Sequence, residues 1–308
     1  MNIIFMGTPI FACGILQALI DEKYNVVAVV SQPDKKVGRK QEVVNTPVKK
    51  LALQHNIPVI QPERIKEDYD EILSYKPDLI ITCAYGQMVP EVILNYPKYG
   101  CVNVHASLLP KYRGGAPIHK CIIDGETQTG ITIMKMVKKM DAGCMYLQNT
   151  VDILEEETTE TLHDKLVIAG SELIKEFIPL YINGKINGVE QDENLVTYAY
   201  NISKEDEFVS FCKEDIKNIY NQIRGLISWP VGYGIINNRR IKFHKVRINL
   251  CNHDYKYGEV IGYDDGMQIA CNGGIICIDE LQLEGKAKMS YKDFINGYGK
   301  TLIGLCFE

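Results

Sequence analysis

Two polar residues one position apart carry the clearest chemical signal in this chain. Asn103 and His105 stand at the end of a predicted strand that begins at Cys101. Because side chains alternate between the two faces of a strand, these two point to the same face. An amide and an imidazole side by side can donate two hydrogen bonds to one carbonyl oxygen. The pair therefore predicts a site that stabilises negative charge developing on that oxygen.

A third polar residue can complete this site. Asp141 follows a predicted strand over 131–136 and precedes a glycine turn. If its loop folds against the loop after His105, the carboxylate would orient the imidazole and favour its charged form. A plainer interpretation stays open for each residue: Asp141 bonding its own backbone in a turn, and Asn103 and His105 as satisfied polar groups.

The elements that must position these residues follow from the apolar pattern. Short apolar runs predict strands over 3–6, 26–30, 58–60, 79–83, 101–104 and 131–136. Helical patterns between them begin after Pro9, after Thr46 and near Ala116. Strands separated by helices indicate a parallel sheet, whose ligands lie at the carboxyl ends of its strands. His105 falls at such an end.

The second half of the chain has a different pattern. A long helix over 158–182 precedes a polar stretch over 191–203 that suits a linker. A helix over 214–226 then leads into short strands with turns at intervals of about ten residues, which indicate a small β-barrel. We therefore predict a first domain over 1–188 that carries the site, a linker over 189–203 and a C-terminal barrel over 204–308.

Composition narrows the class of protein. The 308 residues carry a net charge of −5 and include ten cysteines without a Cys-x-x-Cys pair, which favours reduced thiols over disulfides or a zinc site. No apolar run approaches the roughly 20 residues of a membrane span, and the first residues do not resemble a signal peptide. We expect a cytoplasmic monomer that binds no metal ion.

Two basic clusters could contact the phosphates of a nucleic acid. The first consists of Lys35, Lys36, Arg39, Lys40, Lys49 and Lys50, and the second of Arg239, Arg240, Lys242, Lys245 and Arg247. The first lies mostly in the segment 32–47, which is long for a connection between a strand and a helix and is expected to be a mobile loop. Both clusters can also be read as ordinary solvated surface.

The segment 103–114, Asn-Val-His-Ala-Ser-Leu-Leu-Pro-Lys-Tyr-Arg-Gly, resembles the signature of the folate-dependent formyltransferases. Similar matches to that family occur at 6–12, 32–39, 47–49, 84–86, 113–118, 129–134 and 140–143. In the second half, Gln191-Asp192, Trp229-Pro230 and 286–290 resemble the members that act on methionyl initiator tRNA. The resemblance covers essentially the whole chain, with departures at Ile10, Cys144 and Ser228.

The resemblance implies an α/β fold with a Rossmann-like parallel-sheet domain and a smaller OB-like β-barrel. It implies formyl transfer from 10-formyltetrahydrofolate to the amino group of methionyl initiator tRNA, with Asn103, His105 and Asp141 as the catalytic residues. The implied folate-binding positions are Ala84, Tyr85, Gly86, Gln87, Met88, Ser107, Leu108, Leu109, Pro110, Arg113, Gly114, Lys139 and Met140. The expected tRNA contacts are Lys35, Lys36, Arg39 and Lys40, joined in the barrel by Arg239, Arg240 and Lys242.

Two other functions stay open at this point. The same three catalytic residues could transfer formyl to a small amine, such as a glycinamide ribonucleotide or an amino sugar nucleotide. The length of the chain argues against the glycinamide ribonucleotide, because enzymes that formylate it resemble the first half of this chain alone. The other possibility is a non-catalytic protein that binds folate or RNA on the same scaffold.

Overall fold

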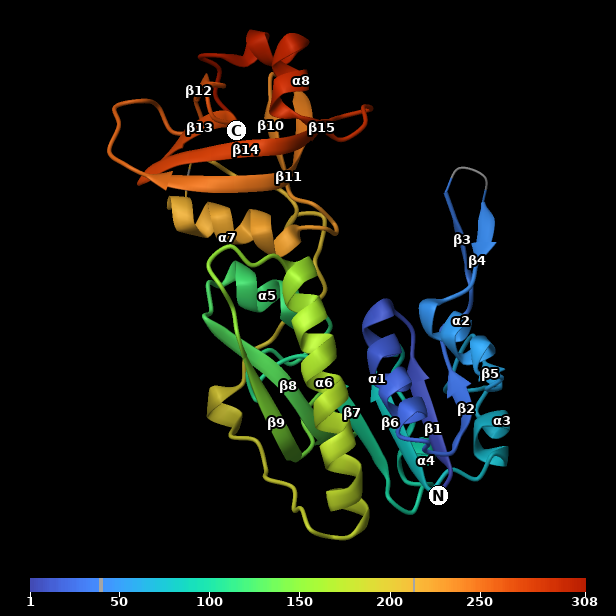
Figure 1. Ribbon diagram of the computed structural model, residues 1–308. Helices are drawn as coiled ribbons and strands as arrows, with labels where there is room; N and C mark the ends of the chain where they lie inside the picture. The colour runs from blue at the N-terminus through green and yellow to red at the C-terminus, as the bar shows by residue number, and fades with distance from the viewer. Residues whose placement is uncertain (39–40, 213) are drawn as a thin grey trace. The chain divides into compact units, whose positions relative to one another are not determined.

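The computed structural model describes residues 1–38, 41–212 and 214–308 (Figure 1). They divide into two compact units, described separately below. The first consists of Met1–Pro117, Gln128–Asp152 and His163–Tyr200, and the second of Ile118–Thr127, Ile153–Leu162 and Asn201–Glu308. Two short segments that are flanked in sequence by the first unit thus belong to the second unit. The domain boundaries at 188 and 203 stay a prediction.

A seven-stranded sheet forms the centre of the first unit. Its strand order is β5-β2-β1-β6-β7-β8-β9. The bounds are β1 Ile3–Gly7, β2 Val26–Val30, β5 Val59–Ile60, β6 Leu79–Cys83, β7 Cys101–His105, β8 Gln128–Lys135 and β9 Met145–Asp152. The predicted parallel arrangement is confirmed for β5, β2, β1, β6 and β7. In contrast, β8 and β9 run antiparallel to their neighbours, and they form a hairpin that needs no crossover helix.

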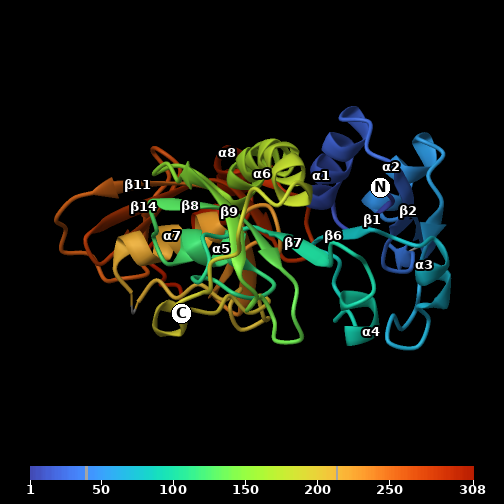
Figure 2. The same ribbon diagram turned by 90° about the horizontal axis from the view of Figure 1, so that it is seen from below.

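Helices cover both faces of this sheet. Figure 2 shows α1 (Ile10–Asp21) and α6 (Thr159–Ile182) on one face and α4 (Glu91–Leu94) on the other. The shorter helices of this unit are α2 (Pro47–Gln54), α3 (Asp70–Ser74) and a 3-10 turn over Glu193–Leu195, whereas α5 (Pro117–Ile123) belongs to the second unit from Ile118 on. The face under α4 is packed by alternate strand residues, among them Ile4, Ile80 and Cys101. Asn103 and His105 continue this alternation and so belong to the same face.

The segment between β2 and α2 differs from the expected loop. Its described residues form a hairpin of β3 (Lys35–Val37) and β4 (Glu42–Val44), with Lys35 opposite Val44 and Lys36 opposite Val43. The β-branched valines favour the strand conformation that the sequence prediction overlooked. Beyond this β3–β4 hairpin, the predicted helix start is confirmed, because the Thr46 hydroxyl accepts a hydrogen bond from the backbone N–H of Lys49.

An antiparallel sheet forms the second unit. Its strands lie in the order β10-β11-β14-β13-β12, with β15 paired to β14. The bounds are β10 Tyr233–Ile236, β11 Arg239–Leu250, β12 Val260–Gly262, β13 Met267–Cys271, β14 Gly274–Leu283 and β15 Met289–Ser290. Its helices are α7 (Ile216–Leu226), α8 (Tyr291–Asn296) and a 3-10 turn over Gly299–Leu302. The curled sheet agrees with the OB-like architecture expected from the sequence.

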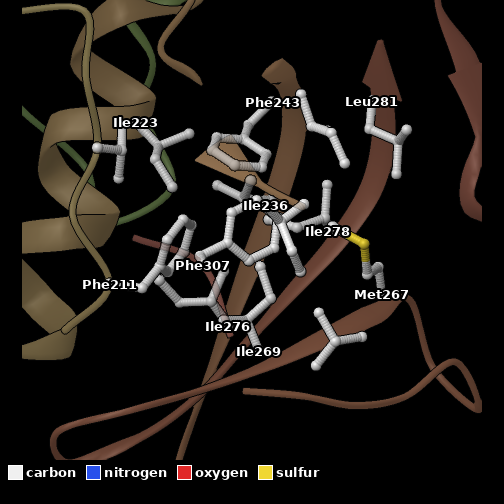
Figure 3. Close-up of a cluster of buried hydrophobic side chains, with 14 of the residues drawn as sticks. Phe211, Ile223, Ile236, Phe243, Met267, Ile269, Ile276, Ile278, Leu281 and Phe307 are labelled. Atoms are coloured by element: carbon white, nitrogen blue, oxygen red, sulfur yellow. The ribbon is translucent and has the colours of Figure 1, made fainter. Parts of the chain in front are cut away.

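The core of the second unit lies between this sheet and α7. Three phenylalanines meet there, with ring centroids 5.4 Å apart for Phe211 and Phe243 and 5.0 Å apart for Phe211 and Phe307 (Figure 3). Ile219 and Ile223, one turn apart on α7, are fully buried against them. Such a stripe explains why the predicted helix over 214–226 forms, since its apolar residues recur at helical spacing.

The structure also bears on the predictions about the cysteines and about membrane-spanning segments. All ten cysteines are free in the structure, and their reduced state stays a prediction. Among the described helices, none is long and apolar enough to cross a membrane.

Candidate active site

The site is built at the carboxyl end of β7. Asn103 lies opposite Thr82 of the parallel neighbour β6, and the Thr82 hydroxyl lies 2.8 Å from Asn103 Oδ1. This contact occupies the oxygen of the carboxamide and leaves its NH2 group to donate elsewhere. The amide is therefore oriented as a hydrogen-bond donor.

His105 is nearly fully buried, and its ring is held by the backbone. Its Nε2 lies 2.9 Å from the carbonyl oxygen of Tyr112. A carbonyl oxygen can only accept, so Nε2 carries a proton and donates. The other ring nitrogen, Nδ1, lies 3.8 Å from Asp141 Oδ2. The ring thus presents Nδ1 toward the carboxylate.

Asp141 lies in the connection between β8 and β9, in the left-handed region with a φ of 49°. Its Oδ2 accepts a hydrogen bond of 2.9 Å from the backbone N–H of Gly114. Gly114 also has a positive φ, and a Cβ there would lie 2.5 Å from the carbonyl oxygen of Ala199. Only glycine fits this position. The structure thus brings Asn103, His105 and Asp141 to one end of the sheet, as predicted, while their catalytic roles stay a proposal.

The predicted folate residues at 84–88 follow β6, whose end adjoins that of β7. Ala84, Gly86 and Met88 are exposed. Tyr85 is buried, and this burial raises the pKa of its phenol. Gln87 instead has a structural contact, because its Oε1 accepts from the backbone N–H of Ile65 at 3.0 Å. The exposed positions are the ones that a ligand can reach.

The predicted folate loop at 107–110 is held in place by Thr132 of β8. The Thr132 hydroxyl donates to the carbonyl oxygen of Ser107 at 2.7 Å and accepts from the backbone N–H of Leu109 at 3.1 Å. Ser107 and Leu109 are buried, whereas Leu108 and Pro110 are partly exposed. The loop is therefore a formed surface beside His105.

Three further predicted folate residues lie around Asp141. Lys139 and Met140 are exposed, and Lys139 Nζ pairs with Glu193 Oε2 at 2.8 Å. The third, Arg113, has a fully buried side chain that is bonded to Gln191 and Glu193. A guanidinium that is buried and bonded within the protein stabilises the loops that it joins. The backbone of Arg113 can still border the folate.

Sequence reasoning missed the residues that line this site from the presumed linker. The segment after α6 returns to the loop over 112–116: the backbone N–H of Arg113 donates to the carbonyl oxygen of Thr197, and that of Ala199 donates back to Arg113. Gln191 and Glu193 lie in the same segment. Hydrogen bonds from Arg113 and Lys139 lower the pKa of Glu193 to about 2. The one signal for these residues was the resemblance at Gln191-Asp192.

The expected tRNA contacts that the structure describes lie on two hairpins. Lys35 and Lys36 are exposed on β3, while Arg39 and Lys40 lie outside the described residues. On β11 of the second unit, the Arg240 guanidinium lies 4.0 Å from the Tyr233 ring centroid, and Arg239 lies 4.8 Å from that of Tyr298. Arg240 and Lys242 line a shallow hollow of about 270 Å³. Cations held on aromatic faces remain free to meet phosphates.

One basic residue of the second cluster is already paired. Arg247 bonds Asp265 and Asp279, and these contacts raise the pKa of its guanidinium. Its charge is therefore largely offset within the protein.

The part of the chain that the structure describes holds no group of three or more His, Cys, Asp or Glu side chains arranged to bind a metal ion.

Comparison with known proteins places the chain in a family. The formyl transferase family model matches residues 1–178, and the model of the formyl transferase C-terminal domain matches residues 201–299. Methionyl-tRNA formyltransferase of Geobacillus sp. (strain WCH70) is 47% identical over 306 residues, which are 98% of this chain and 96% of that protein. The chain belongs to the methionyl-tRNA formyltransferase family. Its match extends over both units, so the family accounts for the second unit as well as for the site.

Solved structures of other formyltransferases share the fold. Methionyl-tRNA formyltransferase from Clostridium thermocellum has a TM-score of 0.56 at 19% identity and covers 81% of this chain and 94% of that one. An N-formyltransferase from Helicobacter canadensis, in complex with folinic acid and dTDP-3-aminofucose, has a TM-score of 0.67 at 20% identity, with 90% and 98% coverage. At such identities the likeness shows the fold alone, and the fold supports several acceptors.

Proposed function

We propose that the protein transfers the formyl group of 10-formyltetrahydrofolate to the free amino group of methionyl initiator tRNA, for use in translation initiation. The observation that carries the proposal is the meeting of Asn103, His105 and Asp141 at the end of β7, in a chain of this family. An amide, an imidazole and a carboxylate at one point suit acyl transfer to an amine.

The reaction places three demands on the site. The amine nitrogen bonds the formyl carbon, the bond from that carbon to the folate nitrogen breaks, and one proton passes from the amine to the folate nitrogen. Negative charge develops on the formyl oxygen during the attack. Asn103 Nδ2 and His105 Nδ1 are the donors left for this oxygen, because Thr82 and Tyr112 occupy the other polar atoms of the two side chains. One such donor contributes a factor of about 10² to 10³ in rate.

Asp141 supports the imidazole in this scheme. Its carboxylate, 3.8 Å from Nδ1, stabilises the charged ring while that ring donates to the formyl oxygen. The proton released by the amine passes through the His105 and Asp141 pair to the departing folate nitrogen, so both residues end the cycle as they began it.

Folate and tRNA are assigned to the surfaces around this point. The exposed positions Ala84, Gly86 and Met88 and the loop over 107–114 border the site at the same edge of the sheet and suit the folate. The β3–β4 hairpin and the basic residues of β11 suit tRNA phosphates. A cytoplasmic, monomeric enzyme that needs no metal ion stays a prediction.

The choice of acceptor tests the proposal. We expect release of tetrahydrofolate from 10-formyltetrahydrofolate when charged initiator tRNA is added, and far slower release with free methionine. Uncharged initiator tRNA is the matched control, because it offers the same phosphates without the amine. Release with an amino sugar nucleotide, but none with charged tRNA, would assign the site to a small amine instead.

A further inference from the structure

One buried carboxamide ties together the two loops that meet at Asp141. Gln191 Nε2 donates to the carbonyl oxygen of Asp141 and to that of Gly143, both at 2.8 Å. Its Oε1 accepts from Arg113 Nε at 3.0 Å and from Arg113 Nη2 at 2.9 Å. Both donor hydrogens and both lone pairs of the side chain are thereby used. A fully bonded buried amide of this kind fixes whatever it joins.

The turn that Gln191 bonds, from Asp141 to Gly143, has an uncommon and tightly packed backbone conformation. Asp141 has a φ of 49°, in the left-handed region, which aspartate enters more readily than most residues but which still costs free energy unless local contacts support it. Two residues on, a Cβ at Gly143 would lie 2.0 Å from the carbonyl oxygen of Lys135. Gln191 grips the carbonyl groups at both ends of this short turn. The conformation of this turn determines where the Asp141 carboxylate points.

The orientation of the carboxamide is set from behind by Arg113. This guanidinium is fully buried and forms a charge-assisted pair of hydrogen bonds with Oε1. Glu193 Oε1 accepts a further bond from Arg113 Nη2 at 2.8 Å. Turning the amide over would place its NH2 group against the guanidinium and its oxygen against two carbonyl groups. Gln191 therefore has a single arrangement.

The contacts close a ring. Arg113 holds Gln191, and Gln191 holds the backbone of Asp141. The Asp141 side chain accepts from the backbone N–H of Gly114, the residue directly after Arg113. Asp141 Oδ2 is the same atom that lies 3.8 Å from His105 Nδ1.

We propose that Gln191 is a positioning residue, which sets the Asp141 carboxylate beside His105 for formyl transfer. The inference rests on the proposed function, and Gln191 itself touches no reacting atom in it. Displacement of a catalytic group by about 1 Å can cost about 10²-fold in rate. Loss of the Gln191 contacts should therefore lower kcat and leave the affinity for tRNA unchanged.

Gln191→Glu separates this role from simple packing. A glutamate keeps an acceptor for Arg113 and the volume of the side chain, but it sets a carboxylate oxygen against the carbonyl groups of Asp141 and Gly143. We expect kcat to fall by about 10-fold or more, with the KM for charged tRNA within about twofold of wild type. Gln54→Glu, the same change at an exposed position of α2, is the control. A kcat of wild-type size in folded Gln191→Glu would overturn the proposal.

A double-mutant cycle tests whether Gln191 acts through Asp141. In an Asp141→Ala background, Gln191→Glu should cause little further loss, because the group that it positions is absent. An undiminished further loss would assign Gln191 a role of its own.

Hydrogen exchange at the Gly114 amide gives a readout that needs no activity. We expect Gln191→Glu to lose protection there, because the Asp141 carboxylate leaves its place. Unchanged protection would contradict the positioning role even if the proposed function were wrong. If Gln191→Glu loses this protection while the wild-type chain transfers no formyl, the positioning role stands and the proposed function is rejected.

Discussion

At the scale of single residues, Asn103 and His105 are each held by a hydrogen bond to one polar atom of the side chain, and the other polar atom is left for the substrate. Thr82 holds Asn103 Oδ1 and leaves Nδ2, and the Tyr112 carbonyl holds His105 Nε2 and leaves Nδ1. Such pre-set donors require no rearrangement when charge develops on the substrate.

The lowered pKa of Glu193 leads to a prediction about how the stability of the fold depends on pH. Its pKa falls from 4.5 to about 2, because Arg113 and then Lys139 donate hydrogen bonds to its carboxylate. A carboxyl with a lowered folded-state pKa stabilises the fold above its unfolded value, and this stability is lost as pH falls through the folded value. We expect Glu193→Gln to lower the Tm at pH 6 and to lose this difference progressively below about pH 4.5.

Thermal unfolding of wild type and Glu193→Gln, followed by circular dichroism at a series of pH values, measures this. A Tm difference that stayed constant from pH 6 down to the lowest pH at which both chains fold would show that the ion pair is not its source.

At the scale of elements, the sequence predicted what depends on local spacing. The period of two in β7 sufficed to place Asn103 and His105 on one face. The hairpin of β8 and β9 and the small hairpin after β2 were not foreseen, since pairing direction and edge strands depend on partners. The contacts of Gln191 were not predicted, because its partner Arg113 is 78 positions away and a polar residue after a helix is usually exposed.

The β3–β4 hairpin gives a prediction about tRNA. Lys35→Ala with Lys36→Ala should raise the KM for charged tRNA and leave folate binding unchanged. Because phosphate contacts release counterions, the variant should also depend less on salt, by about one unit of log-log slope for each lost contact.

Formylation assays across a range of salt concentrations measure this effect. Lys66→Ala with Lys185→Ala, which removes the same charge from exposed positions elsewhere, is the matched control. Equal salt slopes for the hairpin variant and wild type would leave the hairpin as ordinary solvated surface.

At the scale of the whole molecule, two units share one chain by interleaving. Segments at Ile118–Thr127 and Ile153–Leu162 belong to the second unit, although the chain around them builds the first. A boundary drawn from a polar stretch cannot detect this, because contacts rather than composition define the units. The predicted linker region also supplies Gln191, Thr197 and Ala199 to the loops at the site.

The central claim is that Asn103, His105 and Asp141 transfer formyl to charged initiator tRNA as one unit. Its most direct test is the single-turnover rate of transfer in wild type, His105→Ala, Asp141→Ala and the double variant, each shown to be folded by circular dichroism. We expect each single variant to lose about 10²-fold or more, and the double variant to lose about as much as the worse single one. A folded Asp141→Ala or His105→Ala chain that formylates charged tRNA at nearly the wild-type rate would contradict the account.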